Sequence, residues 1–121
     1  MNHASFSGEE FNAFRDIKDP RPLNMLNLVR VYQEVEYPDG EVVSGLEAYR
    51  RYGRLSFPVF EKLGGKIIWR GEMLFSLIGP SDENWDFCFI AEYPSANAFV
   101  SMLKDPNYRE AMKHRQISVR D

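Results

Sequence analysis

The segment KIIWRGEMLFSLIGPSDENWDFCFIAEY (residues 66–93) contains two β-prone runs separated by the turn-forming residues PSDEN. Alternate residues of both runs are apolar: Ile67, Trp69, Met73, Phe75 and Leu77 in the first, and Trp85, Phe87, Phe89, Ala91 and Tyr93 in the second. The residues between them are mixed in polarity. This alternation predicts an antiparallel pair of strands whose apolar face is covered by helices, while the mixed face meets water or another subunit.

The register of this pair follows from the same alternation, because directly opposed residues of an antiparallel pair point to one face of the sheet. We expect Leu77 opposite Trp85 and, in the same register, Arg70 opposite Glu92. Such an opposite-charge pair contributes about 0.2–1 kcal/mol. The register predicts that both charges are structural, so Glu92 is not expected to act as a catalytic carboxylate.

The rest of the chain supplies the other elements of a split βαβ pattern. LNMLNLVRVY (residues 23–32) alternates like a strand, and SGLEAYRRYGRLSFPVFEKLGG (residues 44–65) has the capping box and apolar spacing of a helix. Helical segments follow from residue 95, and QISVRD (residues 116–121) leaves room for a short last strand. We expect an α+β, ferredoxin-like βαββαβ domain at residues 23–121, with its first and third strands side by side in an antiparallel sheet. Residues 1–22 are expected to form an N-terminal helical extension.

Two residues inside the predicted helix at residues 44–65 are unusual for a helix interior. Gly53 lies on the apolar stripe, where the missing side chain would allow close approach to the sheet. Pro58 lacks a backbone N–H group and is expected to kink or split the helix near Phe57.

Composition and charge exclude several classes of partner. The 121 residues carry a net charge of −3 with the two signs interspersed, which argues against nucleic acid or an anionic membrane. No apolar run approaches membrane-spanning length, no signal peptide is evident, and the single cysteine, Cys88, fits a reducing cytoplasm. There is no zinc-ligand spacing, phosphate loop or nucleophile elbow, so no metal or cofactor is expected.

Five segments of the chain are similar to one known family: MLNLVR, YRRYG, LGGKIIWRG, LIGPSDENWDFCFIAEYPSANAF and DPNYREAMKHR. Between residues 23 and 115 the sequence resembles the domain of unknown function 1330 family (DUF1330), within the dimeric α/β-barrel superfamily. The resemblance implies a ferredoxin-like protomer whose sheet packs against the sheet of a second subunit, and a small apolar pocket between sheet and helices. It implies no particular reaction, since fold likeness alone is a weak guide to chemistry.

Two polar residues are the candidates for catalysis. Asn27 lies on an otherwise apolar strand face, where a buried amide without a partner costs about 1–3 kcal/mol; it forms either a structural bridge or part of a pocket wall. His114 falls in the last turn of a predicted helix, beside Lys113 and Arg115. It is either a cation at the negative end of that helix or a base or ligand in a pocket.

The candidate ligand-binding residues are Asn27, Tyr49, Tyr52, Trp69, His114 and Arg115. Aromatic residues on inner faces are otherwise ordinary core. The residue types of Asn27, Trp69 and His114 resemble those used by haem-degrading relatives in the superfamily, although no local motif joins them.

Two classes of function follow. The first is a homodimer that binds a small apolar or aromatic ligand, with Leu26, Leu28, Leu74 and Ile90 making the mixed sheet face too apolar for water. The second is an enzyme: a cofactor-poor monooxygenase or isomerase, or a haem-binding or haem-degrading protein that uses His114. The absence of a compact catalytic motif favours the first class.

Overall fold

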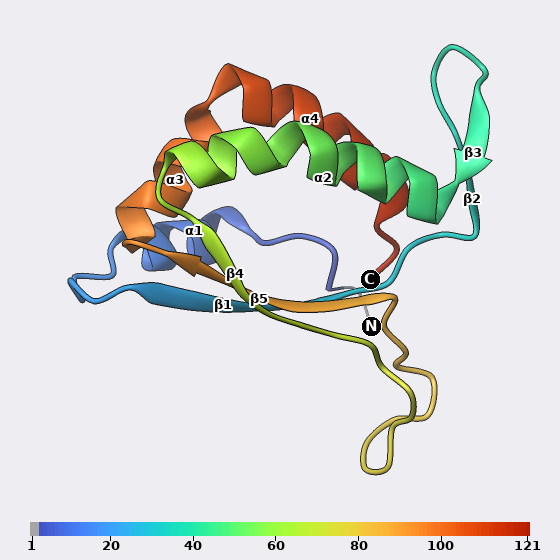
Figure 1. Ribbon diagram of the computed structural model, residues 1–121, viewed down its shortest axis with the longest axis horizontal. Helices are drawn as coiled ribbons and strands as arrows, with labels where there is room; N and C mark the ends of the chain where they lie inside the picture. Colours follow the sequence, from blue (N-terminus) through green and yellow to red (C-terminus); the bar gives the residue numbers. More distant parts are fainter. Residues whose placement is uncertain (1–2) are drawn as a thin grey trace.

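The computed structural model describes residues 3–121 (Figure 1). Its elements in chain order are α1 (Gly8–Arg15), β1 (Leu23–Val29), β2 (Glu34–Glu36), β3 (Val42–Ser44), α2 (Gly45–Lys62), β4 (Lys66–Gly71), β5 (Phe87–Tyr93), α3 (Ala96–Lys104) and α4 (Pro106–Ser118). The long strands form an antiparallel sheet in the order β1-β5-β4, and β2 and β3 form a separate hairpin. The predicted α+β fold is confirmed, with the first and third strands of the ferredoxin-like order, β1 and β5, side by side.

The sheet is covered on one face only. Figure 1 shows α2 and α4 lying together over the sheet, whereas no helix covers its opposite face. β1 alternates as predicted: Met25, Asn27 and Val29 are shielded on the helix side, while Leu26 and Leu28 are exposed. We call the uncovered side of the sheet the open face.

The predicted fourth strand is reduced to one bridge. Val119 pairs with Val31 beyond the end of β1, and the backbone N–H of Arg30 donates to the carbonyl oxygen of Asp121 at 2.8 Å. Residues 116–118 are helical because α4 continues to Ser118, so little chain is left for a strand.

The predicted register between residues 66–78 and 85–93 is wrong. Arg70 lies opposite Phe89, and Lys66 lies opposite Glu92. The register already differs by four residues at the start of β4, where Lys66 instead of Arg70 lies opposite Glu92. A β-bulge at Ile68 then places one extra residue in β4 and reverses the faces of the residues that follow. Glu92 therefore has an opposite charge across from it, but the charge belongs to Lys66.

The bulge also changes what each face carries. Trp69 is aligned with Ile90 and Leu26, a row on the open face, and 49% of its surface is exposed. Its predicted place on the same face as Ile67 is therefore wrong. β4 ends at Gly71 rather than continuing to residue 78, and residues 72–84, which we call the arm, extend away from the helices (Figure 1). Four apolar side chains of the arm are each at least 78% exposed: Leu74, Phe75, Leu77 and Ile78.

Side-chain caps lie at the helix starts, including the cap predicted for the helix at residues 44–65. Ser7 and Glu10 form a reciprocal capping box, Ser44 caps α2, and Ser95 caps α3. Pro58 does not split α2, which runs unbroken to Lys62; Gly64, with φ of 86°, then reverses the chain. No helix within residues 3–121 has the length and apolar character needed to cross a bilayer.

Two apolar clusters join the helices to the sheet. The larger contains Val59, Phe60, Ala91, Tyr93, Met102 and Tyr108, and the smaller contains Val29, Val31, Tyr49 and Val119. The N-terminal extension packs onto α3 through the rings of Phe14 and Phe99, whose centroids are 5.1 Å apart. The domain boundary at residue 22 stays a prediction.

The start of α4 can be tested through its cap. Asp105 accepts hydrogen bonds from the backbone N–H groups of Asn107 and Tyr108, and Tyr108 belongs to the larger core cluster. Asp105→Ala should lower the free energy of unfolding by about 0.5–2 kcal/mol. Asp105→Ser, which keeps a capping oxygen, should recover most of this loss in urea unfolding followed by circular dichroism. Equal losses in both variants would show that Asp105 does not act as a cap.

Candidate functional site

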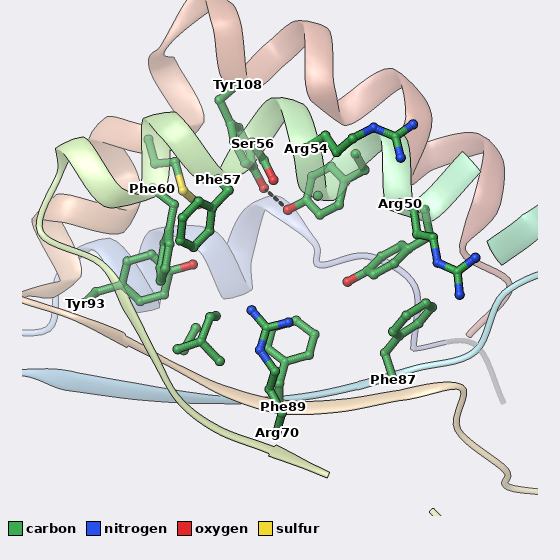
Figure 2. Close-up of a pocket in the computed structure, with 16 residues that line it drawn as sticks. Arg50, Arg54, Ser56, Phe57, Phe60, Arg70, Phe87, Phe89, Tyr93 and Tyr108 are labelled. Atoms are coloured by element: carbon green, nitrogen blue, oxygen red, sulfur yellow. Dashed lines mark hydrogen bonds between the residues drawn. The ribbon is translucent and has the colours of Figure 1, made fainter. Parts of the chain in front are cut away.

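A cavity of about 450 Å³ lies between α2 and the inner face of the sheet (Figure 2). Its walls are mainly aromatic and include Tyr49, Phe57, Phe60, Phe87, Phe89 and Tyr93. Alternation along β5 directs Phe87, Phe89 and Tyr93 to the same face, and α2 supplies the opposite wall. We call this space the aromatic cavity.

Gly53 helps to keep the aromatic cavity open. It lies in the middle of α2 and lines the cavity, and a Cβ atom added there would meet no atom within 4 Å. The prediction that Gly53 allows close approach to the sheet is therefore wrong, because no neighbour is close. Glycine inside a helix costs about 0.5–1 kcal/mol relative to alanine, so this position carries a penalty that packing does not require.

Hydroxyl groups supply the polar lining deep in the cavity. The Tyr52 and Tyr108 hydroxyl oxygens are 2.8 Å apart (Figure 2). Burial raises the pKa of Tyr49, Tyr93 and Tyr108 above the usual tyrosine value. These phenols therefore stay protonated at neutral pH, and the three side chains serve as hydrogen-bonding groups rather than as bases.

The charged residues of the aromatic cavity are all arginines. Arg50 and Arg54 come from α2 and Arg70 comes from β4. No carboxylate or imidazole of residues 3–121 lines this cavity. The lining thus offers cations and hydroxyl groups but no ordinary general base.

A second cavity, of about 440 Å³, lies beside the first and is lined by residues from β1, α3, α4 and the N-terminal segment 3–6. Tyr52, Tyr93 and Tyr108 line both spaces and so form the partition between them. Asn27 and Arg115 line the second cavity. Their hydrogen bonds are to backbone: Asn27 Nδ2 donates to the Met25 carbonyl at 3.0 Å, and Arg115 Nη1 donates to the Ala4 carbonyl at 3.0 Å.

The six predicted ligand-binding residues are thus divided among four places. Tyr49 and Tyr52 line the aromatic cavity, while Asn27 and Arg115 line the second cavity. Trp69 lies on the open face, and His114 lines neither cavity. The structure does not bring Asn27, Trp69 and His114 together, so the likeness to haem-degrading relatives has no geometric counterpart here.

His114 joins α4 to the β2–β3 hairpin. Its Nδ1 atom is 2.6 Å from the Tyr37 hydroxyl, and the Arg51 guanidinium lies over the Tyr37 ring, 5.2 Å from its centroid. Burial, followed by the charges of Arg51 and Arg54, lowers the pKa of His114 below its ordinary value of 6.5. A neutral imidazole that accepts a hydrogen bond from the Tyr37 hydroxyl fits this environment better than a cation does, and the role of His114 stays a prediction.

Comparison with known proteins agrees with the resemblance seen in the sequence. The family model for the domain of unknown function DUF1330 matches residues 42–120. The chain belongs to the DUF1330 family. None of the curated proteins matches it.

Two solved structures are very similar to this DUF1330 protein. One is the methylated RPA0582 protein, at 53% identity and a TM-score of 0.95, covering 99% of this chain and 89% of that one. The other is the RPA0582 protein of unknown function from Rhodopseudomonas palustris, a structural genomics target, at 53% identity and a TM-score of 0.94. That match covers 100% of this chain and 92% of the other.

The DUF1330 match contains α2, β4, β5 and α4, which build the aromatic cavity. Of the residues that line this site, the six predicted ligand-binding residues include only Tyr49 and Tyr52. The alternation along β5 puts Phe87 and Phe89 on the inner face, and this pattern is the sequence signal that marks them as pocket walls. The sequence pattern predicts Arg70 on the opposite face, because nothing in it marks the bulge at Ile68.

The lowered pKa of His114 predicts a pH dependence of stability. Because the pKa of His114 is lowered in the folded protein, the unfolded chain binds more protons below pH 6.5. The contribution of neutral His114 to the free energy of unfolding is therefore complete above pH 6.5 and is lost as the pH falls through the lowered pKa. We would measure the midpoint temperature of thermal unfolding between about pH 8 and pH 5. As the pH falls, this temperature should decrease more steeply for the natural protein than for His114→Gln. Parallel curves for the two proteins would contradict the assignment.

Proposed function

We propose that this DUF1330 protein binds a small aromatic or apolar compound in the aromatic cavity. The observation that supports this proposal most is the open space in front of Gly53, in a cavity of about 450 Å³ with mainly aromatic walls. Ligand sites typically have this character: concave, largely apolar, and supplied with a few polar groups that orient the ligand. The Tyr52–Tyr108 pair offers such polar groups.

Binding has more support than acid–base catalysis. The aromatic cavity lacks a carboxylate or imidazole from residues 3–121, and burial raises the pKa of three of its tyrosines. A cofactor-poor monooxygenase or isomerase is the second candidate, in which the Tyr52 and Tyr108 hydroxyls would donate to a substrate oxygen. The haem-binding alternative has less support, because His114 lines neither cavity and lies within hydrogen-bond distance of Tyr37.

Substitutions at Gly53 test the ligand site. Gly53→Leu should fill the cavity and abolish binding of 2-naphthamide, measured by isothermal titration calorimetry, because the leucine side chain takes the open space. Gly53→Ala is the matched variant: it should retain binding and raise the free energy of unfolding by about 0.5–1 kcal/mol. Gly8→Leu, at another open glycine outside both cavities, controls for added bulk. Failure of the natural protein to bind, or unchanged binding by Gly53→Leu, would refute the proposal.

We also propose that the protein is a symmetric homodimer formed through the open face and the arm. Leu26, Leu28 and Trp69 are exposed on this face, and the arm adds four apolar side chains that are at least 78% exposed. A contiguous apolar surface of this kind commonly marks an interface. A second copy is the favoured partner because one chain carries both the face and the arm, so two copies can cover each other symmetrically.

The dimer can be tested by size-exclusion chromatography with light-scattering detection. The natural chain should elute as a dimer at micromolar concentration, and Leu26→Glu combined with Leu28→Glu should convert it to a monomer. These leucines are already exposed in a single chain, so the folded protomer should tolerate the charges. Leu55→Glu, an exposed position on α2, is the control and should remain dimeric. A natural protein that is monomeric, or a double variant that stays dimeric, would refute the interface.

A further inference from the structure

We propose that the ligand of the aromatic cavity carries a carboxylate group, bound by Arg70 from the sheet and Arg50 from α2. The inference rests on the proposed function and names its ligand class: a small aromatic acid. Three observations support it: the β-bulge in β4, the distribution of ion pairs, and the position of the two guanidinium groups.

The bulge at Ile68 is what brings Arg70 to the cavity. In a regular strand that continued from Ile67 opposite Ala91, Arg70 would lie opposite Cys88 and face away from the helices. The extra residue instead places Arg70 opposite Phe89, and both residues line the cavity. Bulges often occur next to functional sites, where they redirect a side chain.

The positive charge at the aromatic cavity is not neutralised by the chain itself. Arg54 pairs with Glu47 at 3.0 Å, and Arg51, which lies outside the cavity lining, pairs with Glu41 at 2.8 Å. Within residues 3–121, neither Arg50 nor Arg70 forms an ion pair. The whole chain has a net charge of −3. Acidic residues thus outnumber basic ones, yet these two arginines at the cavity have no acidic partner.

The aromatic walls do not use these two guanidinium groups either. The cation–π contact described for residues 3–121 joins Arg51 to Tyr37, and neither Arg50 nor Arg70 takes part in one. Figure 2 shows Arg70 rising from the sheet beside Phe89, while Arg50 descends from α2 toward Phe87. Both residues line the aromatic cavity, Arg70 from the sheet wall and Arg50 from the α2 wall.

A carboxylate fits this arrangement best. The planar guanidinium group of arginine donates two parallel hydrogen bonds to a carboxylate, and such charge-assisted bonds are stronger than neutral ones. With the carboxylate held by Arg50 and Arg70, the ring of the ligand would pack against Phe87 and Phe89. Its far end would point toward the Tyr52–Tyr108 hydroxyl pair, which could bond a polar substituent.

Two probes that share one ring system but differ in charge distinguish recognition of the carboxylate from binding of the ring. We would titrate 2-naphthoate and its neutral isostere 2-naphthamide into the natural protein, Arg70→Gln, Arg50→Gln and the double variant by isothermal titration calorimetry. The natural protein should bind 2-naphthoate about tenfold or more tightly than 2-naphthamide. The double variant should lose this preference while its affinity for 2-naphthamide stays within about twofold.

Two further variants control for general effects of charge. Arg120→Gln removes an exposed arginine outside both cavities and should keep the full preference for 2-naphthoate. Arg70→Lys keeps the charge without the planar fork, so it should keep more of the preference than Arg70→Gln.

The outcomes distinguish this inference from the proposed function. Equal affinity of the natural protein for both probes, or equal loss of both in the double variant, would overturn the carboxylate assignment while leaving ring binding in place. If neither probe binds, the proposed function itself fails, and the assignment of the ligand class fails with it.

Discussion

The central strand β5 is hydrogen-bonded to β1 on one side and to β4 on the other, so its register sets which side chains meet across the whole sheet. On the β4 side that register contains one irregularity, the bulge at Ile68. Because successive residues of a strand point to opposite faces, one extra residue exchanges the faces of everything after it. Arg70 thereby comes to the helix side and Trp69 to the open face. The position of Arg70 at the aromatic cavity and the position of Trp69 on the open face both depend on this single residue.

The layer between sheet and helices is closely packed at two clusters but left open between them. A void normally costs stability, because the atoms lining it lose dispersion contacts. Here α2 adds a second cost by carrying Gly53 where neither a positive φ nor a close neighbour requires glycine. The void and the helical glycine both lower the stability of the fold at the same place. Such local losses of stability are typical of functional sites. The tyrosine partition then divides the remaining space into two chambers of similar size.

The helix layer is held together at the end near the hairpin by polar contacts. α2 and α4 pack against each other, and each contains a fully buried alanine, Ala48 in α2 and Ala111 in α4. The Tyr37 hydroxyl reaches His114 on α4, and Arg51 on α2 stacks on Tyr37 while pairing with Glu41. The hairpin thus joins both helices, which positions the helical wall of the aromatic cavity relative to its sheet wall.

The sequence by itself determined the features that depend on near neighbours: the helix caps at Ser7, Ser44, Ser95 and Asp105, the alternation of β1 and β5, and the order of elements in the fold. A cap bonds a residue two or three positions away, and alternation has a period of two, so both can be recognised in a short window. The site could be predicted only in part, as an aromatic-lined space that includes Tyr49 and Tyr52. Only the tertiary structure decided the bulge at Ile68, the end of β4 at Gly71, the space at Gly53 and the contact between Tyr37 and His114, residues separated by 77 positions. These features depend on which distant segments pack together, and many registers and packings satisfy the same apolar pattern.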